Sequence, residues 1–375
     1  MSNEQKKENK SKFSQFLKKL ITWVNILFVL ALLLSAWSQR ISPEIISWSN
    51  LMGLAFPVLL ILNILWTFAW ILQFNVRFLF STIALIICWG EIQTYCPIND
   101  VTSPAIYNKA PRNLKFKLLS YNVMGWDTNK KINGHNESVD LINQMNADIV
   151  CIQESGYTTN KKYLTTKEIR RQLNQYPYIQ DNKRQGGLVL FSKFPIIKSW
   201  YKRGHTTLRQ TVFYTLKLGQ DTLVVINNHL VSTGLNINNK ITFDSISHLN
   251  HSENELVNAI EIPKKLAKKS QLRAQQIDEL CHEVSKLKKR YRYVILCGDL
   301  NDSPISYTHY RLHQLLRDAY VDKGRGPGIT YNKNRLWVRI DHIMPCHHLE
   351  TTNCKVIRQS KSSDHYPIFA KMLLK

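Results

Sequence analysis

The chain has 375 residues, enough for one large domain with an extra segment or for two to three domains. Apolar residues make up 44% and charged residues 21%, which excludes disordered and collagen-like chains, and 50 Lys and Arg against 27 Asp and Glu give a net charge of +23. The seven cysteines include no Cys-x-x-Cys pair, which argues against a disulfide scaffold and a structural zinc site.

The first 95 residues have the pattern of a membrane anchor. A basic tail, residues 1–20, holds six Lys against two Glu. A spanning helix needs about 20 mostly apolar residues, so the first two of the runs that follow predict transmembrane helices. The third has 13 residues and spans only if its helix continues past Glu91 towards Ile98. The three apolar runs are Ile21–Trp37, Leu51–Phe74 and Phe78–Gly90.

The number of spans decides which side of the membrane holds the rest of the chain. The basic tail predicts a cytoplasmic N-terminus, and Arg77 between the second and third runs fits a short cytoplasmic loop. Three spans, the interpretation favoured here, put everything after about residue 95 outside the cytoplasm, whereas two spans keep it inside. A cleaved signal peptide followed by buried helices is the weaker alternative, because the first run lacks a persuasive cleavage site.

Residues 96–113 hold three prolines and predict a linker, and residues 114–375 predict one large α/β domain. Residues 235–270 are polar and poorly periodic, and predict an insertion near a site. Strands and helices mix without strict alternation, which favours a sheet sandwich with helices outside over a Rossmann fold. Strands are predicted at Leu114–Val123, Ala147–Ser155, Gly186–Ile196, Thr211–Val231 (two strands around Gly219) and Arg292–Asn301, and helices at Ser138–Asn146, Thr165–Tyr176 and Gln271–Arg290.

Cysteine usage leaves the compartment of this domain open. Cys151 and Cys297 lie in apolar strand-like runs, which predicts buried free thiols. Cys346 and Cys354 are eight residues apart, and either pair in an oxidising compartment or stay free.

Polar residues occur at the ends of several predicted strands and near the C-terminus. Alone, an Asp or Asn at a strand end is most often a turn residue. Together they supply hard oxygen ligands and two histidines, a set that suits magnesium, manganese or calcium better than zinc. Phosphoester hydrolysis needs such parts: a metal to neutralise charge, a base for water, and donors for phosphate oxygens. The set consists of Asn122, Glu154, His229, Asp299, Asn301, Asp341, Asp364 and His365.

In chain order, the segments SYNVMGW, DIVCIQES, GGLVLFSKFPI, NNHLVSTG, GDLNDSP, RIDHI and SDHYPI resemble the signatures of the endonuclease/exonuclease/phosphatase superfamily. The resemblance extends from Leu114 to Leu374 and implies a deoxyribonuclease I-like, four-layer α/β/β/α sandwich. With NNHLVSTGLN and Arg273–Gln276, the N-terminal segment also resembles a bacterial, membrane-anchored subset. For Arg273 itself we favour a structural role over substrate contact.

The resemblance implies a metal site and names its ligands. Glu154 would be the principal Mg²⁺ ligand, with Mn²⁺ or Ca²⁺ as alternatives. Asn122 would assist at the metal and the phosphate. Asp364 would assist metal binding or orient a histidine.

The resemblance also implies catalytic roles. His229 would bind the phosphate or protonate the leaving group, Asp299 and Asn301 would position water or a histidine, and Asp341 would lie near the site. His365 would act as general base or stabilise the transition state, and the choice of Asp299 or His365 as base stays open. If His365 is the base, the rate rises near an imidazole pKa of about 6.5.

These features predict a membrane-anchored, divalent-metal-dependent phosphoester hydrolase of the phosphodiesterase, nuclease or phosphatase type. From residue 101 onward, 42 Lys and Arg against 22 Asp and Glu give +20, which favours a nucleic acid, a phospholipid or sphingolipid, or an inositol phosphate as substrate. The charge also fits simple solubility or attraction to membrane lipids. The alternative function is a catalytically weak membrane-tethered module that binds phosphorylated ligands. The predicted location is the cell membrane, multi-pass, with the catalytic domain outside the cytoplasm.

Overall fold

The computed structural model describes residues 3–100, 105–128, 134–156, 164–182, 186–202, 208, 210–232, 253–331, 333, 337–359 and 362–375. Its helices are α1 (Asn3–Ser38), α2 (Ser49–Leu72), α3 (Phe78–Ile87), α4 (Trp89–Tyr95), α5 (Ala105–Lys109), η1 (Arg112–Leu114), α6 (Met124–Thr128), α7 (Glu137–Met145), α8 (Thr166–Gln172), α10 (Glu253–Arg290), α11 (Tyr307–His313) and α12 (Ala319–Lys323). Its strands are β1 (Lys115–Asn122), β2 (Ile149–Gln153), β3 (Tyr178–Asn182), β4 (Leu188–Ser192), β5 (Ile196–Trp200), β6 (Thr211–Leu218), β7 (Asp221–His229), β8 (Tyr293–Asp299), β9 (Asp341–Pro345), β10 (Leu349–Val356) and β11 (Ile368–Leu374).

The first sheet has six strands in the order β10-β11-β1-β2-β4-β3. Its central strands β1 and β2 are parallel, and Asn122 pairs with Gln153 at their carboxyl ends. One face of the sheet packs against Val139 of α7 and Ile169 of α8 in an apolar cluster. Central strands buried on both faces consist of nearly continuous apolar residues, which explains the runs seen in the sequence.

The second sheet has five strands in the order β5-β6-β7-β8-β9. Strand β7 is parallel to β8, and β9 is antiparallel to β8. This register aligns His229 with Asp299, and Asp299 with Asp341. Because directly opposed residues on neighbouring strands present their side chains on the same face, the sheet brings these three side chains together.

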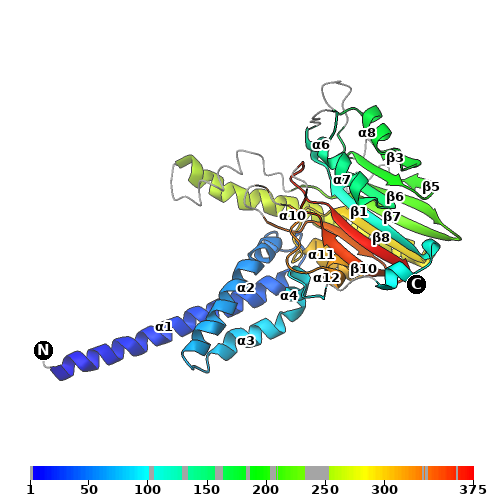
Figure 1. Cartoon of the computed structure of the whole chain (residues 1–375). Coiled ribbons are helices and arrows are strands. Elements are labelled where there is room, and N and C mark those ends of the chain that lie inside the picture. Colours follow the sequence, from blue (N-terminus) through cyan, green and yellow to red (C-terminus); the bar gives the residue numbers. More distant parts are fainter. Residues whose placement is uncertain are drawn as a thin grey trace.

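The two sheets pack face to face between helices, which confirms the predicted four-layer sandwich (Figure 1). Helix α10 covers the outer face of the second sheet through apolar residues that include Ile277 and Leu280. The predicted strand pair within Thr211–Val231 is present as β6 and β7, with the turn at Gly219.

Helices α1, α2 and α3 form a bundle that projects from one end of the sandwich (Figure 1). Lys12–Ser38 of α1 and the 24 residues of α2 are long and apolar enough to cross a membrane. Helices α3 and α4 together also pass this test, but they bend by 67° at the break between them. The predicted third run is therefore helical, but its first helix ends at Ile87 and α4 continues in a new direction.

Two other boundaries differ from the sequence predictions. Helix α10 begins at Glu253, so the predicted insertion is helical over 253–270, while 235–252 lies outside the described residues. Its residues 263–265, a proline and two lysines, are exposed, and such a stretch does not carry the apolar periodicity that marks a helix in sequence. The run Gly186–Ile196 contains β4 and only the first residue of β5, because the chain turns before Pro195.

The segment predicted as a linker, residues 96–113, contains the short helix α5, and its residues 101–104 lie outside the described part of the chain. All seven cysteines are free, and Cys346 and Cys354 are both buried without pairing.

Candidate active site

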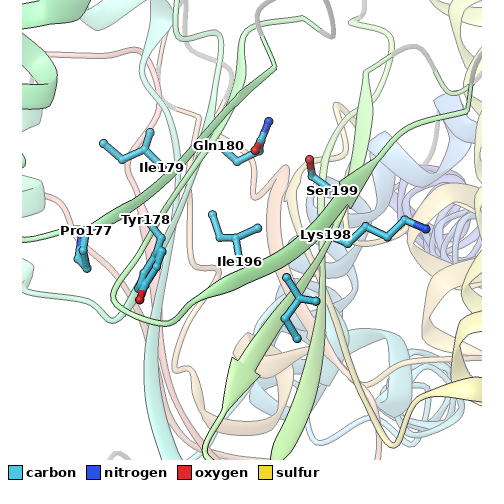
Figure 2. Close-up of a pocket in the computed structure, with 8 residues that line it drawn as sticks. Pro177, Tyr178, Ile179, Gln180, Ile196, Lys198 and Ser199 are labelled. Carbon is cyan, nitrogen blue, oxygen red and sulfur yellow. The ribbon is translucent and has the colours of Figure 1, made fainter.

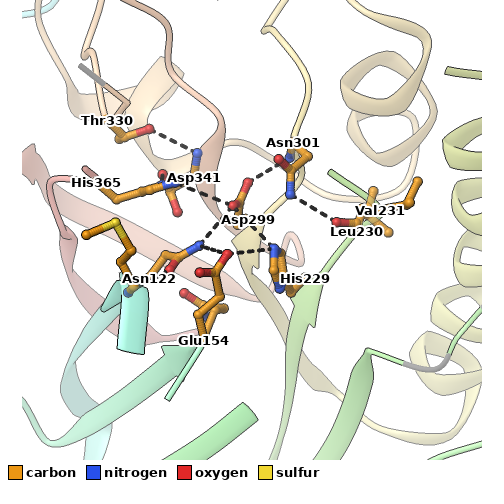
Figure 3. A network of polar contacts seen from close by, with 12 residues as sticks. Asn122, Glu154, His229, Leu230, Val231, Asp299, Asn301, Thr330, Asp341 and His365 are labelled. Carbon is orange, nitrogen blue, oxygen red and sulfur yellow. Dashed lines mark hydrogen bonds and ion pairs between the residues drawn. The ribbon is translucent and has the colours of Figure 1, made fainter. Parts of the chain in front are cut away.

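Seven of the eight predicted site residues meet at the carboxyl ends of the parallel strands (Figure 3). Asn122 ends β1 and Glu154 follows β2 in the first sheet, and His365 precedes β11 of the same sheet. The other four lie in the second sheet or directly after one of its strands. Parallel strands that end at one edge place their terminal side chains in the same region, so the topology builds the site. The seven are Asn122, Glu154, His229, Asp299, Asn301, Asp341 and His365.

Glu154 lies in a strained turn directly after β2. Its φ of 53° is in the left-handed region, which residues other than Gly, Asn and Asp seldom adopt. The next backbone N–H, from Ser155, donates to the carbonyl of Gly187 at 3.0 Å. A Cβ on Gly187 would lie 2.8 Å from that nitrogen, so only glycine fits beside the turn. The strain at Glu154 is typical of a functional position, since surrounding structure must hold it.

Asn122 joins the two sheets at the site. Its Nδ2 donates to Oε1 of Glu154 at 3.1 Å and to Oδ2 of Asp299 at 3.2 Å. Its Oδ1 accepts from the backbone N–H of Met124 at 3.1 Å, which fixes the orientation of the amide. Asn122 therefore holds a carboxylate from each sheet close to the same amide group.

Asp299 is the buried centre of the cluster. Its Oδ1 accepts from the backbone N–H of Asn301 at 2.7 Å, and its Oδ2 lies 3.7 Å from Nε2 of His229 and 3.8 Å from Nε2 of His365. Burial, followed by the negative charge of Asp341, raises the pKa of Asp299 to about 6. Asn301 also adopts a left-handed φ of 52° and donates its Nδ2 to a backbone carbonyl at 2.9 Å.

His365 is oriented by Asp341, whose Oδ2 lies 2.8 Å from its Nδ1. The backbone N–H of Asp341 donates to Oγ1 of Thr330 at 3.1 Å, which fixes the backbone that carries the carboxylate (Figure 3). Burial alone would lower the pKa of His365, but the carboxylates of Asp341 and Asp299 raise it to about 10. The raised pKa favours the protonated imidazole at neutral pH. The choice of Asp299 or His365 as general base stays a prediction.

Asp364 is half-buried beside His365, and its negative charge also contributes to the raised pKa of that imidazole. The carboxylate in contact with Nδ1 of His365 is nevertheless Asp341. The role of Asp364 as a metal ligand or orienting group stays a prediction.

Several buried polar atoms of the cluster lack partners within the described structure. Neither ring nitrogen of His229 has a hydrogen-bond partner there, although Nε2 lies 3.5 Å from Oε1 of Glu154, and Oδ1 of Asp341 has none either. Ligand atoms of Asp299, Asp341 and His365 lie within 4.8 Å of one another. Unpaired buried donors and acceptors need an explanation. Together with the half-exposed Glu154 carboxylate, they fit a divalent cation and an anionic ligand.

Sequence analysis missed a buried polar contact beneath the site. Nε2 of Gln153 donates to Oδ1 of Asn227 at 2.7 Å, and Nδ2 of Asn227 donates to the carbonyl of Ile152 at 3.0 Å. This pair connects β2 to β7 one or two residues before Glu154 and His229. The signal available in the sequence was an amide side chain at the end of each apolar run, where an apolar side chain is usual.

Arg273 is buried among protein contacts, as a structural role requires. Its side chain is 3% exposed, and it contacts Oδ2 of Asp302 at 3.4 Å and the carbonyl of Val231 at 3.3 Å.

A second cluster of aspartate and histidine lies on the other face of β9. Oδ2 of Asp318 lies 3.0 Å from Nε2 of His309 and 2.8 Å from Nδ1 of His342, and Oδ1 accepts from the N–H of Tyr320 at the start of α12. Burial alone would raise the pKa of Asp318, but the two histidines hold it well below its usual value. Both oxygens of Asp318 are therefore used by the protein itself.

A separate depression of about 330 Å³ lies between β3 and β5, the edge strands of the two sheets (Figure 2). Tyr178, Ile196 and Lys198 contribute to its lining. None of the predicted site residues lines it, so it is distinct from the cluster at the strand ends.

Comparisons with known proteins agree with this arrangement. The model of the endonuclease/exonuclease/phosphatase family matches residues 119–365, about two thirds of the chain, and a model described as a domain of unknown function (DUF8431) matches residues 18–95. No curated protein matches the chain.

Three similar solved structures have low sequence identity. Humanized D. rerio TDP2 is 16% identical with a TM-score of 0.49, over 69% of this chain and 98% of that one. The human Nocturnin catalytic domain with bound sulfate anion is 16% identical with a TM-score of 0.47, over 73% and 100%. An endonuclease/exonuclease/phosphatase from Bacteroides vulgatus is 12% identical with a TM-score of 0.46, over 70% and 99%.

Proposed function

Because the chain belongs to the endonuclease/exonuclease/phosphatase family, we propose that it is a membrane-anchored, divalent-metal-dependent hydrolase of phosphoester bonds. Members of the family are generally metal-dependent hydrolases of such bonds. The main support within this chain is the convergence of Glu154, His229 and the Asp299–Asp341–His365 group at one edge of two sheets. A binding module with little turnover is the alternative that the test below separates.

Glu154 would hold the metal, and Asn122 would orient the Glu154 carboxylate through Nδ2, since its own oxygen accepts from Met124. Carboxylate oxygens are ligands that Mg²⁺ prefers, and the side chain of Glu154 is 42% exposed, so a hydrated ion has access to it. When bound there, a divalent cation supplies charge neutralisation at the phosphate oxygens.

The protein groups divide the remaining chemistry between a base and a cation. With a pKa of about 6, Asp299 is mostly ionised at neutral pH and is suited to accept a proton from water. With a pKa of about 10, His365 is cationic and is suited to donate a hydrogen bond to a phosphate oxygen as negative charge grows there. His229, whose ring nitrogens make no hydrogen bond among the described residues, is the candidate for contact with the phosphate or the leaving group.

The hydrolysis test uses the full chain in detergent micelles or lipid nanodiscs, with Mg²⁺ or EDTA. Substrates are plasmid DNA, sphingomyelin, phosphatidylinositol phosphates and a chromogenic phosphodiester. We expect Mg²⁺-dependent turnover that Glu154→Ala abolishes and Glu350→Ala retains, since Glu350 is a similarly exposed carboxylate on β10 that pairs with Lys375. Binding without turnover, or turnover insensitive to both EDTA and Glu154→Ala, would reject the proposal.

The path of the bundle supports three membrane crossings. The N-terminus and the turn between α2 and α3 lie at the end away from the sandwich, whereas α4 lies at the near end (Figure 1). The six lysines of residues 1–20 and Arg77 before α3 therefore belong to the far end, and the positive-inside rule makes that end cytoplasmic. The catalytic domain then lies outside the cytoplasm. Helix α3 alone rises only about 15 Å, so the third crossing needs α4 as well.

Labelling of single cysteines in intact bacterial cells tests this topology. In a chain with the half-buried Cys96 replaced by alanine, a membrane-impermeant maleimide is expected to label Lys355→Cys in intact cells. It is expected to label Gln73→Cys, at the far end of α2, only after permeabilisation. The reverse pattern would place the catalytic domain inside.

A further inference from the structure

The end of the membrane anchor is bonded directly to the loop that carries two site residues. Asn50, in the first turn of α2, is 2% exposed. Its Nδ2 donates to Oδ2 of Asp302 at 2.8 Å, and its Oδ1 accepts from the backbone N–H of Tyr307 at 3.1 Å. Both ends of this buried amide are therefore satisfied by the catalytic domain, 252 or more residues away in sequence.

Asp302 follows Asn301 and holds the shape of this loop. Its Oδ2 also accepts from Oγ1 of Thr308 at 2.8 Å and contacts Nε of Arg273 at 3.4 Å. Its Oδ1 accepts from the backbone N–H of Ser303 at 3.1 Å. The carboxylate is thus the junction at which the anchor, helix α10 and the start of α11 meet, directly after the site residues at the end of β8.

A second buried contact joins the anchor to the loop before Asp341. Arg339 is 1% exposed and donates to the backbone carbonyls of Thr94 and Tyr95 at the end of α4. The two loops are also linked to each other, since the N–H of Leu300 donates to the carbonyl of Ile340 at 2.8 Å. The anchor therefore contacts the loops next to Asp299 and Asp341, two of the three segments that supply carboxylates to the site.

Close packing accompanies these polar contacts. Ile305 of the catalytic domain lies in one apolar cluster with residues of the bundle that include Leu32, Phe56 and Ala84. A Cβ added to Gly53 of α2 would overlap the carbonyl oxygen of Ile305, so the helix approaches that backbone as only glycine allows. A flexible tether would not need a buried amide, a buried guanidinium and a backbone contact at its junction.

We propose that the anchor is a structural part of the active site and that Asn50 is a positioning residue, which holds the Asp299–Asn301 loop through Asp302. The inference rests on the proposed hydrolase function. It means that turnover requires the anchor to be docked, and that membrane attachment is not its only role. Small displacements matter because a misplacement of about 1 Å of a reacting group lowers a rate by about 100-fold.

The test compares two buried asparagines of the same helix in the full chain. Asn63 also lies in α2 and is fully buried, but its Nδ2 donates to the carbonyls of Phe28 and Leu59 within the bundle. We expect Asn50→Ala to lower kcat by about 10- to 100-fold with KM changed less than about threefold. We expect Asn63→Ala to leave both constants near wild type. Equal kcat values for the two variants would overturn the proposal.

A reciprocal exchange separates positioning from general damage. Asn50→Asp places two carboxylates face to face and is expected to lose more activity than Asn50→Ala, because buried like charges repel. The double variant Asn50→Asp with Asp302→Asn has one hydrogen-bond donor and one acceptor at positions 50 and 302 again. Its kcat is expected to be at least about tenfold higher than that of Asn50→Asp alone. An additive loss in the double variant would count against the contact.

Hydrogen exchange provides a readout independent of turnover. Amides of residues 298–303 are expected to exchange faster in Asn50→Ala than in wild type, and at the wild-type rate in Asn63→Ala. If wild type hydrolyses none of the substrates but this difference appears, the proposed function fails and the docking stands. If wild type turns over and the exchange is unchanged in Asn50→Ala, the docking inference fails alone.

Discussion

Two clusters of aspartate and histidine lie on opposite faces of strand β9. Asp341 and His342 are neighbours, and successive side chains of a strand point to opposite faces. Asp341 therefore contacts His365 in the candidate active site, and His342 contacts Asp318, which caps α12, in the second cluster. In both clusters three ligand atoms lie within 4.8 Å of one another, so residue type and proximity do not separate them.

The clusters differ in which polar atoms the protein has already satisfied. Oδ1 of Asp318 caps α12, and Oδ2 serves two histidines, so both carboxylate oxygens are already used by the protein. Nε2 of His342 has no hydrogen bond among the described residues, but this side chain is 0% exposed. Oδ1 of Asp341 and both nitrogens of His229 also lack hydrogen bonds among the described residues, and Glu154 beside them is open to solvent. Unsatisfied atoms with access to water, rather than composition, distinguish a reactive site from a structural one.

The largest expected effect contrasts the two histidines. His365→Asn is expected to lower kcat by about 10²- to 10⁴-fold with little change in melting temperature, because under the proposed function it removes the cation that faces the phosphate. His342→Asn is expected to lower the melting temperature while the kcat of the folded protein stays within about tenfold of wild type. Steady-state assays and thermal melts of the full chain measure both. Equal losses of kcat would break the contrast between the clusters.

Removal of the structural aspartate is expected to affect stability most. Asp318→Ala leaves His309 and His342 without their acceptor and uncaps α12, which costs about 3–5 kcal/mol of unfolding free energy. Asp322→Asn is the control, since it alters only the partly exposed ion pair with Arg317 and is expected to cost less than about 1 kcal/mol. Urea unfolding measures the difference. If Asp318→Ala lowers the free energy of unfolding no more than the control does, this cluster does not stabilise the fold.

The pH dependence of the hydrolysis rate distinguishes Asp299 from His365 in the candidate active site. The rate is expected to rise through about pH 6 as Asp299 loses its proton, and to fall through about pH 10 as His365 loses its charge. The residual activity of His365→Asn should lack the alkaline fall. An alkaline fall that persists in His365→Asn would assign it to another group, and a wild-type rate still rising above about pH 8 would argue against Asp299 as the base.

Much of the site could be predicted because its residues follow strands with clear apolar patterns. The ends of β1, β2, β7 and β8 are visible in the sequence, and the resemblance supplied which end residues converge. Asp341 was found from its signature, although it begins β9 rather than ending a strand. The antiparallel pairing of β9 with β8 explains why it still reaches Asp299.

The contacts missed by sequence analysis join residues that no local pattern connects. Asn50 and Asp302 are 252 residues apart, and Arg339 meets the carbonyl of Thr94 across 245 residues. In the sequence alone, an asparagine at the start of an apolar helix is expected at a membrane interface, and only the fold shows that it contacts the catalytic domain. The protonated state of His365 was also hidden, because it depends on two carboxylates that the fold brings to the imidazole.

The smallest expected effect assigns the metal to one cluster. An ion that binds only the folded protein stabilises it by about 2.7 kcal/mol at 100 times its dissociation constant, so Mg²⁺ is expected to raise the melting temperature of wild type by a few degrees. Glu154→Ala should lose this shift. His309→Gln should keep it, because Asp318 has no free oxygen for a metal in the first place. A shift lost in His309→Gln and kept in Glu154→Ala would move the metal to the other face of β9, and would refute the rule that unsatisfied atoms mark the site.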